Sequence, residues 1–199
     1  MRAALLALLA LSGSAGAAVF DDRRDTDWRR AATAADRARL RGWRSAWMTA
    51  LADARTTREG VAAVASDAAL YDPDRSLEQP LPPPGDYRCR TVKLGRRGAT
   101  GLGYVAYGWF RCWIGERGEF VRLEGSQRQV GRLFTDTDAR AVFLGTLALG
   151  NERSPIAYRR DPQRDLAGLV ERIGERRWRI AFPYPAFESM LDVVEVVPR

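Results

Sequence analysis

The stretch DYRCRTVKLGRRGATGLGYVAYGWFRCWI (residues 86–114) decides the fold. Two runs rich in aromatic and β-branched residues, at 87–94 and 104–114, flank a glycine-rich segment, which predicts an antiparallel β-hairpin. Alternate side chains of a strand point to opposite faces, so we assign the face that carries Cys112 to the core. The opposite face, which carries Trp109, is also aromatic. We therefore expect this strand to be buried on both sides, with the N-terminal helices covering the second face.

The two cysteines of the chain lie on this hairpin. A turn centred between Thr100 and Gly101 pairs residues whose numbers sum to 201, as the numbers of Cys89 and Cys112 do. This register predicts that the two cysteines lie directly opposite each other, at a distance that suits a disulfide. The sequence therefore predicts a Cys89–Cys112 disulfide that closes the first hairpin.

The pattern of short strands and turns continues to the end of the chain. Turns containing glycine, such as those at 116–118 and 174–175, separate several of the runs. The predicted strands are 87–94, 104–114, 119–124, 128–134, 141–149, 166–173, 176–182 and 190–197. About eight strands joined by hairpins favour an antiparallel β-meander, either a closed, calycin-like barrel or a sandwich. A barrel of eight strands can hold one small ligand.

The N-terminal part predicts a pair of helices instead. Thr33 and Asp36 form a capping signature, and apolar residues then recur at helical spacing as far as Ala54. The capping box at residues 56–59 predicts a second helix that starts at Thr56 and runs toward Ala69.

A proline-rich break at residues 79–85 separates the helices from the strands, since no helix or central strand can cross it. The predicted class is thus α+β: a helical segment (18–79) packed on an antiparallel β-domain (86–199), together forming one structural unit.

Residues 1–17 have the three parts of a cleavable export signal. Arg2 supplies a positive charge, residues 3–11 are apolar, and Ala15-Gly16-Ala17 predicts cleavage before Ala18. The apolar run is too short for a membrane anchor, which needs about 20 residues. We therefore expect a soluble periplasmic or secreted protein with no stable membrane insertion after cleavage, in a compartment that oxidises thiols.

The composition excludes several chemistries. The 199 residues contain no histidine, so a Ser-His-Asp triad, a Cys-His pair and histidine-ligated metals are excluded. The net charge is +7, from 32 basic and 25 acidic residues, and Lys93 is the only lysine. The arginines are spread along the chain beside acidic residues, which favours a solvated surface with weak attraction to anionic envelope polymers. Nucleic acid is a poor candidate partner because no nucleic-acid-binding module is present.

No catalytic set, metal site or cofactor site is predicted. Asp136-Thr137-Asp138 lacks the third carboxylate and the glycine of a calcium loop, and Ser126 has no histidine base. Paired carboxylates could serve a glycosidase, but nothing in the sequence brings two of them together. The isolated carboxylates are Glu124, Glu171, Glu188, Asp192 and Glu195.

One set of residues is a candidate ligand-binding patch. Its aromatic rings could stack a sugar or an apolar ligand around one guanidinium, although packing inside the protein would explain the same residues. The candidates are Tyr104, Tyr107, Trp109, Arg111 and Trp113.

Several stretches together resemble an uncharacterised family of small exported bacterial proteins, domain of unknown function 4893. The resemblance covers essentially the whole chain after residue 17 and implies no activity. A weaker architectural analogy to lipocalin-type barrels lacks the expected Gly-x-Trp on the first strand. The stretches are WRRAATAADRARLRGWR (28–44), PPPGDYRCRTVKLG (82–95), YVAYGWFRC (104–112), GSQRQVGRLF (125–134), FLGTLALG (143–150), DLAGLVERIG (165–174) and FESMLDVVEV (187–196).

These observations favour a non-catalytic binding module of the cell envelope. Its site would be the barrel mouth or the aromatic patch, and its ligand a small apolar molecule, a glycan or an envelope protein. The alternatives are a histidine-free hydrolase that uses two carboxylates, and a purely structural or protein-interaction domain.

Overall fold

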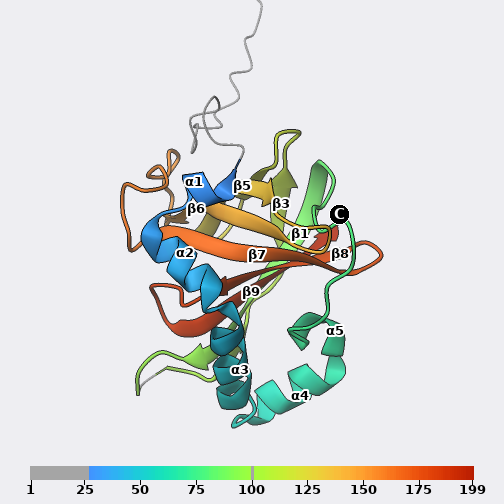
Figure 1. Cartoon of the computed structure of the whole chain (residues 1–199). Coiled ribbons are helices and arrows are strands. Elements are labelled where there is room, and N and C mark those ends of the chain that lie inside the picture. Colours follow the sequence, from blue (N-terminus) through green and yellow to red (C-terminus); the bar gives the residue numbers. More distant parts are fainter. Residues whose placement is uncertain (1–26, 100) are drawn as a thin grey trace, which may run out of the picture.

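A computed structural model describes residues 27–99 and 101–199 of the chain, so the predicted export signal lies outside the described residues. Within these residues, five short helices precede nine strands (Figure 1). The helices are α1 (Trp28–Ala31), α2 (Ala34–Arg41), α3 (Trp43–Ala54), α4 (Arg58–Ser66) and α5 (Ala68–Tyr71). The strands are β1 (Gly85–Arg96), β2 (Tyr104–Ala106), β3 (Phe110–Ile114), β4 (Glu119–Arg122), β5 (Gln127–Thr135), β6 (Ala141–Leu149), β7 (Asp165–Gly174), β8 (Arg177–Pro183) and β9 (Ser189–Pro198).

The predicted class is confirmed, and the barrel is closed. Neighbouring strands pair antiparallel in the order β1-β3-β4-β5-β6-β7-β8-β9, and β9 pairs back with β1 along most of its length. Strand β2 pairs only with β1 and is an additional strand beside the eight of the barrel. Closure satisfies the backbone hydrogen bonds of β1 and β9, which would otherwise be sheet edges.

The helices cover one part of the barrel surface. Helices α1 and α2 lie on β6 and β7, while α3 lies across β1, β8 and β9 (Figure 1). The apolar stripe of α3, which includes Trp47 and Leu51, packs on Leu94 and Val193 from the outside of the barrel. A second apolar cluster, which includes Phe143 and Phe182, fills the interior.

The predicted helix boundaries are partly wrong. Thr33 caps α2 through the backbone N–H of Asp36, as predicted. However, Gly42 separates α2 from α3, so residues 33–54 form two helices. The next helix is capped by Thr57 rather than started at Thr56, because the Thr57 hydroxyl accepts a hydrogen bond from the backbone N–H of Gly60.

The predicted strand 104–114 is interrupted. Its first part, β2, pairs with the second half of β1, and its last part, β3, pairs with the first half. Residues 107–109 lie between them and belong to no strand. The three residues let the chain leave the extra strand and enter the barrel.

The disulfide is present, but the predicted register is wrong. Cys89 lies opposite Phe110 and Cys112 lies opposite Tyr87, so paired numbers sum to 199 instead of 201. The turn is centred nearer Ala99, where the β1–β2 pairs converge. A shift of two residues keeps both cysteines on the inner face, and their Cα atoms are 5.9 Å apart, a normal disulfide distance.

The expectation that both faces of 104–114 are covered is also wrong. Cys112 and Ile114 point into the barrel, but Trp109 and Trp113 each remain 40% exposed, and Tyr107 is 42% exposed. The described helices pack on β6 to β9, on the second half of β1 and on β2, and not on β3. The outer face of β3 is therefore left to solvent.

Ion pairs fasten the helical part to the barrel. The guanidinium of Arg179, on β8, is fully buried, pairs with Glu171 on β7, and donates to the backbone carbonyl of Leu70 at 3.0 Å. It also lies 4.5 Å from the centre of the Trp47 ring. A buried guanidinium without such partners would be strongly unfavourable, so these contacts fix α3 and α5 on the barrel wall.

Candidate ligand-binding pocket at one end of the barrel

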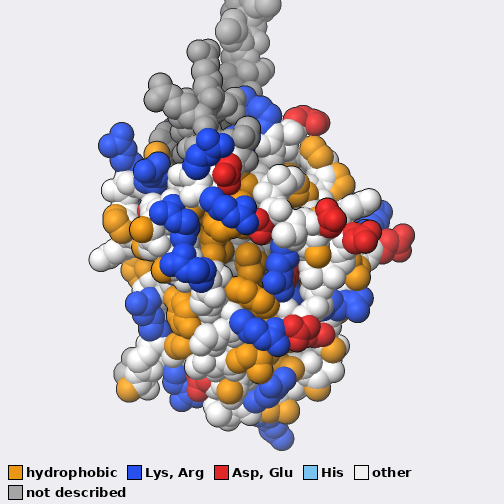
Figure 2. Space-filling model, viewed as in Figure 1, with side chains coloured by type: hydrophobic (Ala, Val, Ile, Leu, Met, Phe, Trp, Pro, Cys, Tyr) orange, Lys and Arg blue, Asp and Glu red, His pale blue; other side chains and the backbone are white. Residues whose placement is uncertain are grey.

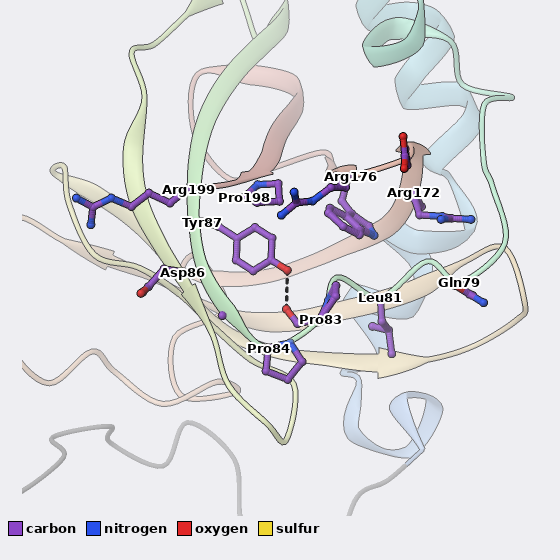
Figure 3. Close-up of a pocket in the computed structure, with 13 residues that line it drawn as sticks. Gln79, Leu81, Pro83, Pro84, Asp86, Tyr87, Arg172, Arg176, Pro198 and Arg199 are labelled. Carbon is purple, nitrogen blue, oxygen red and sulfur yellow. Dashed lines mark hydrogen bonds between the residues drawn. The ribbon is translucent and has the colours of Figure 1, made fainter.

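A pocket of about 470 Å³ lies at the end of the barrel where β1 begins and β9 ends (Figure 3). Its volume is in the range of pockets that bind small organic molecules. Residues 79–85 form one wall, because this segment runs from β7 across the barrel end to β1. Leu77 binds the backbone of Arg172 at the start of that path. The proline-rich break that separates helices from strands is thus also part of the pocket.

Two aromatic rings from inside the barrel form the floor. Tyr87 on β1 and Trp178 on β8 meet edge to face, with ring centres 6.1 Å apart. The Tyr87 hydroxyl donates to the backbone carbonyl of Pro83 at 2.6 Å, which ties the wall to the floor (Figure 3). Burial raises the pKa of Tyr87, and the charge of Arg176 only partly opposes this, so the phenol stays protonated at neutral pH.

Two residues that line this pocket carry N–H donors without an acceptor. The indole Nε1 of Trp178 and the Nε of Arg172 are buried, and neither has a hydrogen-bond partner among the described residues. Their residues are directly paired across β7 and β8, with side chains on the same face of the sheet. A buried donor without an acceptor costs about 1–3 kcal/mol, so this end of the barrel retains unused hydrogen-bonding capacity.

The charged groups of the pocket are mostly at its rim. Arg176 reaches from the β7–β8 turn toward the Tyr87 ring (Figure 3), and Arg199 lies beyond the end of β9. Asp86 and Glu175 are the two carboxylates of the lining, and both are exposed.

The sequence-predicted patch lies elsewhere, and the structure splits it. Tyr104 is half-buried under the helices, where its hydroxyl is 3.1 Å from that of Tyr71. Arg111 and Trp113 share the outer face of β3, Trp109 lies just before this strand, and Arg111 binds Glu124.

Trp109 lies beside two guanidiniums of β1. Those of Arg88 and Arg90 are 5.3 and 5.0 Å from the centre of its ring. Tyr107 precedes this face, in the segment between β2 and β3. The patch is therefore an open surface, not a cavity.

The carboxylates weighed for a hydrolase all form ion pairs. Glu171 pairs with Arg179, Glu195 with Arg177, and Glu124 with Arg111. The other two share a partner, which is described next.

Glu188 and Asp192 both pair with Lys93, at 3.2 and 3.0 Å, at the other end of the barrel. Burial alone would lower the pKa of Lys93, but the two carboxylates raise it, so the amine stays charged. The space beside this cluster is about 10 Å³, room for one water and not for a sugar ring.

The structure also assigns another role to the candidate calcium loop. Asp136 accepts hydrogen bonds from the Trp28 indole at 2.9 Å and from Arg29 at 2.7 Å, and so anchors α1. No cluster of three or more metal-ligating side chains occurs between residues 27 and 199, residue 100 excepted.

Sequence reasoning did not identify the pocket residues as a site. Tyr87, Arg172 and Trp178 each fell on a predicted strand. The alternation of Trp178 with Ile180 and Phe182 is a signal that could have assigned these three to one inward face. What was missing was the pairing of Arg172 with Trp178, which a local register shift before Gly174 determines.

The fold and the pocket define an α+β protein built on a closed antiparallel barrel with a small-molecule-sized cavity at one end. The chain belongs to the family Domain of unknown function (DUF4893), whose model matches residues 28–196. No curated protein and no solved structure matches the chain. In the described part of the chain, no helix combines the length and the apolar character that a membrane crossing requires.

Proposed function

We propose that this protein is a non-catalytic binding module that holds a small molecule in the pocket at the Tyr87–Trp178 end of the barrel. The observation that carries the proposal is the coincidence of a cavity of about 470 Å³ with two unsatisfied donors, on Trp178 and Arg172. An aromatic floor offers area for an apolar ligand, and a few polar groups fix its orientation.

We also propose that the module works outside the cytoplasm. The sequence pattern of residues 1–17 supports export, and the Cys89–Cys112 disulfide is compatible with an oxidising compartment.

The proposal is tested by isolating the protein from its own cells without denaturation and identifying small molecules that copurify, by native mass spectrometry. The matched control is Leu81→Trp, which places a larger side chain in the half-buried wall of the pocket. We expect the natural protein to retain a small molecule that the variant loses. A molecule retained equally by both proteins would contradict binding in this pocket.

A second candidate function is contact with a macromolecule through the outer face of β3. Exposed tryptophans flanked by arginines are typical of interaction surfaces. Trp109, Trp113 and Leu123 are 40–44% exposed on this side of the barrel. The partner would be an envelope protein or an anionic envelope polymer.

Trp113→Ala provides the test of this second candidate. The substitution should weaken retention of such a partner. Because the Trp113 side chain is partly solvated, the melting temperature should fall by no more than about 2 °C. Retention unchanged by the substitution would remove this candidate.

The wider surface argues for a local interaction site rather than a general polyanion-binding surface. Guanidiniums are spread over the visible face, between exposed apolar side chains (Figure 2). Many arginines are also neutralised by carboxylates in the described residues, as in the pairs Arg44–Asp74 and Arg164–Glu152.

A further inference from the structure

We infer that the ligand of the barrel-end pocket is a small organic acid, whose oxyanion group binds between Trp178 and Arg172. The inference rests on the proposed function and adds the chemical class of the ligand to it. The shared chemistry is a carboxylate or a phosphate ester attached to an apolar or aromatic body.

The unsatisfied groups in the pocket are all of one kind. An indole Nε1–H only donates, and a guanidinium presents N–H donors and no acceptor. Two of the six buried side-chain polar atoms without a partner in the described residues are the Nε1 of Trp178 and the Nε of Arg172. These two residues face each other across β7 and β8, and their unsatisfied nitrogens have no accessible surface in the free protein. A side-chain rotation that turns both nitrogens toward the pocket lets one bidentate group accept from both. An oxyanion offers two such acceptor oxygens, whereas an alcohol or amide offers one.

The arginines of the pocket differ from those beside them. Arg177 and Arg179, on the outer face of β8, pair with Asp67 and Glu171. The guanidinium of Arg172 makes no ion pair or hydrogen bond with any described residue. Arg176 and Arg199 likewise form no ion pair with a carboxylate of the described residues. Three guanidiniums around one cavity therefore lack counter-ions within those residues.

The two carboxylates of the lining do not substitute for a bound anion. Asp86 and Glu175 are exposed at the rim, where water screens their charge. Trp178 is only 5% exposed, and the Nε of Arg172 is buried, so electrostatic interactions are stronger at the floor than at the rim.

The remaining surface of the pocket suits the apolar body of such a ligand. Leu81, Pro83 and Pro84 line one wall of the pocket, and Pro83 lies next to the Tyr87 ring (Figure 3). Removal of this apolar area from water adds affinity that is common to an acid and to its neutral analogue. The preference for the acid therefore isolates the contribution of the donors.

The inference is tested with matched pairs of small molecules: benzoate and benzamide, 4-phenylbutyrate and 4-phenylbutanamide, and phenyl phosphate and phenol. Each is titrated into the ¹⁵N-labelled full-length protein while the indole N–H signals are followed by NMR. The Trp178 signal is assigned by its loss in Trp178→Phe. The carboxylate and phosphate members distinguish the two kinds of acid.

We expect at least one acid to shift the Trp178 signal downfield and to bind at least about tenfold more tightly than its neutral partner. Arg172→Gln should abolish this preference. Arg160→Gln should keep it, because Arg160 is an exposed arginine in the β6–β7 connection with no place in the pocket lining.

Two different failures can be separated. If the neutral partners shift the Trp178 signal and bind as tightly as the acids, the acid assignment is wrong, while binding in the pocket stands. If no compound moves this signal at about 10 mM, the acid assignment falls, and the proposed function is decided separately by the copurification comparison with Leu81→Trp. The comparison of acid with neutral partner uses the natural protein, so the inference remains testable even if Arg172→Gln does not fold.

Discussion

The unsatisfied indole of Trp178 predicts an unusual response to mutation. Trp178→Phe leaves about 40 Å³ unfilled, which costs about 1 kcal/mol at ~24 cal/mol per Å³. The substitution also removes a buried donor that has no acceptor, which returns about 1–3 kcal/mol. The free energy of unfolding should therefore be unchanged, or raised by up to about 2 kcal/mol. Most substitutions of a buried tryptophan lower it.

Trp47 provides the matched control. It is 1% exposed, and its Nε1 donates to the backbone carbonyl of Tyr71 at 3.2 Å. Trp47→Phe loses the same volume, but it also breaks a hydrogen bond and leaves a buried carbonyl without a donor. We expect it to lower the free energy of unfolding by about 2–4 kcal/mol.

Urea unfolding followed by circular dichroism measures both variants against the natural protein, with equal m-values as the condition for comparing midpoints. The free energies of the two variants should differ by at least about 2 kcal/mol. Equal losses would show that the Trp178 N–H is satisfied in the folded protein, by a bound water for example. The free donor on which the pocket assignment depends would then not exist.

Three further predictions concern the framework of the barrel. Replacing Cys89 and Cys112 with alanine removes a disulfide that joins residues 23 positions apart in the sequence. The free energy of unfolding should fall by about 3 kcal/mol. An unchanged urea midpoint after reduction of the natural protein would contradict this. Arg179→Met leaves the buried carboxylate of Glu171 incompletely paired. The free energy of unfolding should fall by about 3–5 kcal/mol in the same assay. A loss below about 1 kcal/mol would show that the ion pair does not hold the helices on the barrel. Burial alone would raise the pKa of Asp67, but the hydrogen bonds and charge of Arg177 outweigh it and bring the pKa below 3.8. The ionised Asp67 carboxylate therefore stabilises the fold above that pH, and this stabilisation is lost as the pH falls through the lower pKa of the folded state. Asp67→Asn should make the free energy of unfolding depend less on pH in the acid range. An unchanged pH dependence would refute the assignment.

Local patterns predicted much of this fold. Alternating strands, glycine turns and a proline-rich break were enough for an α+β class with a barrel or sandwich of about eight strands, because hairpin order follows chain order. The capping of α2 by Thr33 could also be predicted, because it involves only residues that are neighbours in the sequence. Closure of β9 on β1 is a contact between distant segments, so the sequence could not decide between barrel and sandwich.

The errors have physical causes of the same kind. The register of Cys89 depended on where the turn folds, and the turn lies nearer Ala99 than the glycine pattern implied. Trp109 and Trp113 were expected to be covered because large aromatic residues are usually buried, but which strands the helices cover is set by tertiary packing.

The pocket could not be derived from any single segment. Its residues come from the proline-rich break, the start of β1, the β7–β8 turn and the end of β9, which meet only when the barrel closes. Its most informative feature, the free donors of Arg172 and Trp178, is a property of the whole hydrogen-bond network rather than of a motif.

The most direct test of the central claim is a crystal structure of the protein with 4-phenylbutyrate. The account predicts the carboxylate about 3 Å from the Nε1 of Trp178 and the Nε of Arg172, with the phenyl ring against Tyr87 and the wall at residues 79–85. Ligand density only on the outer face of β3, beside Trp109 and Trp113, with the barrel-end pocket filled by water, would contradict it.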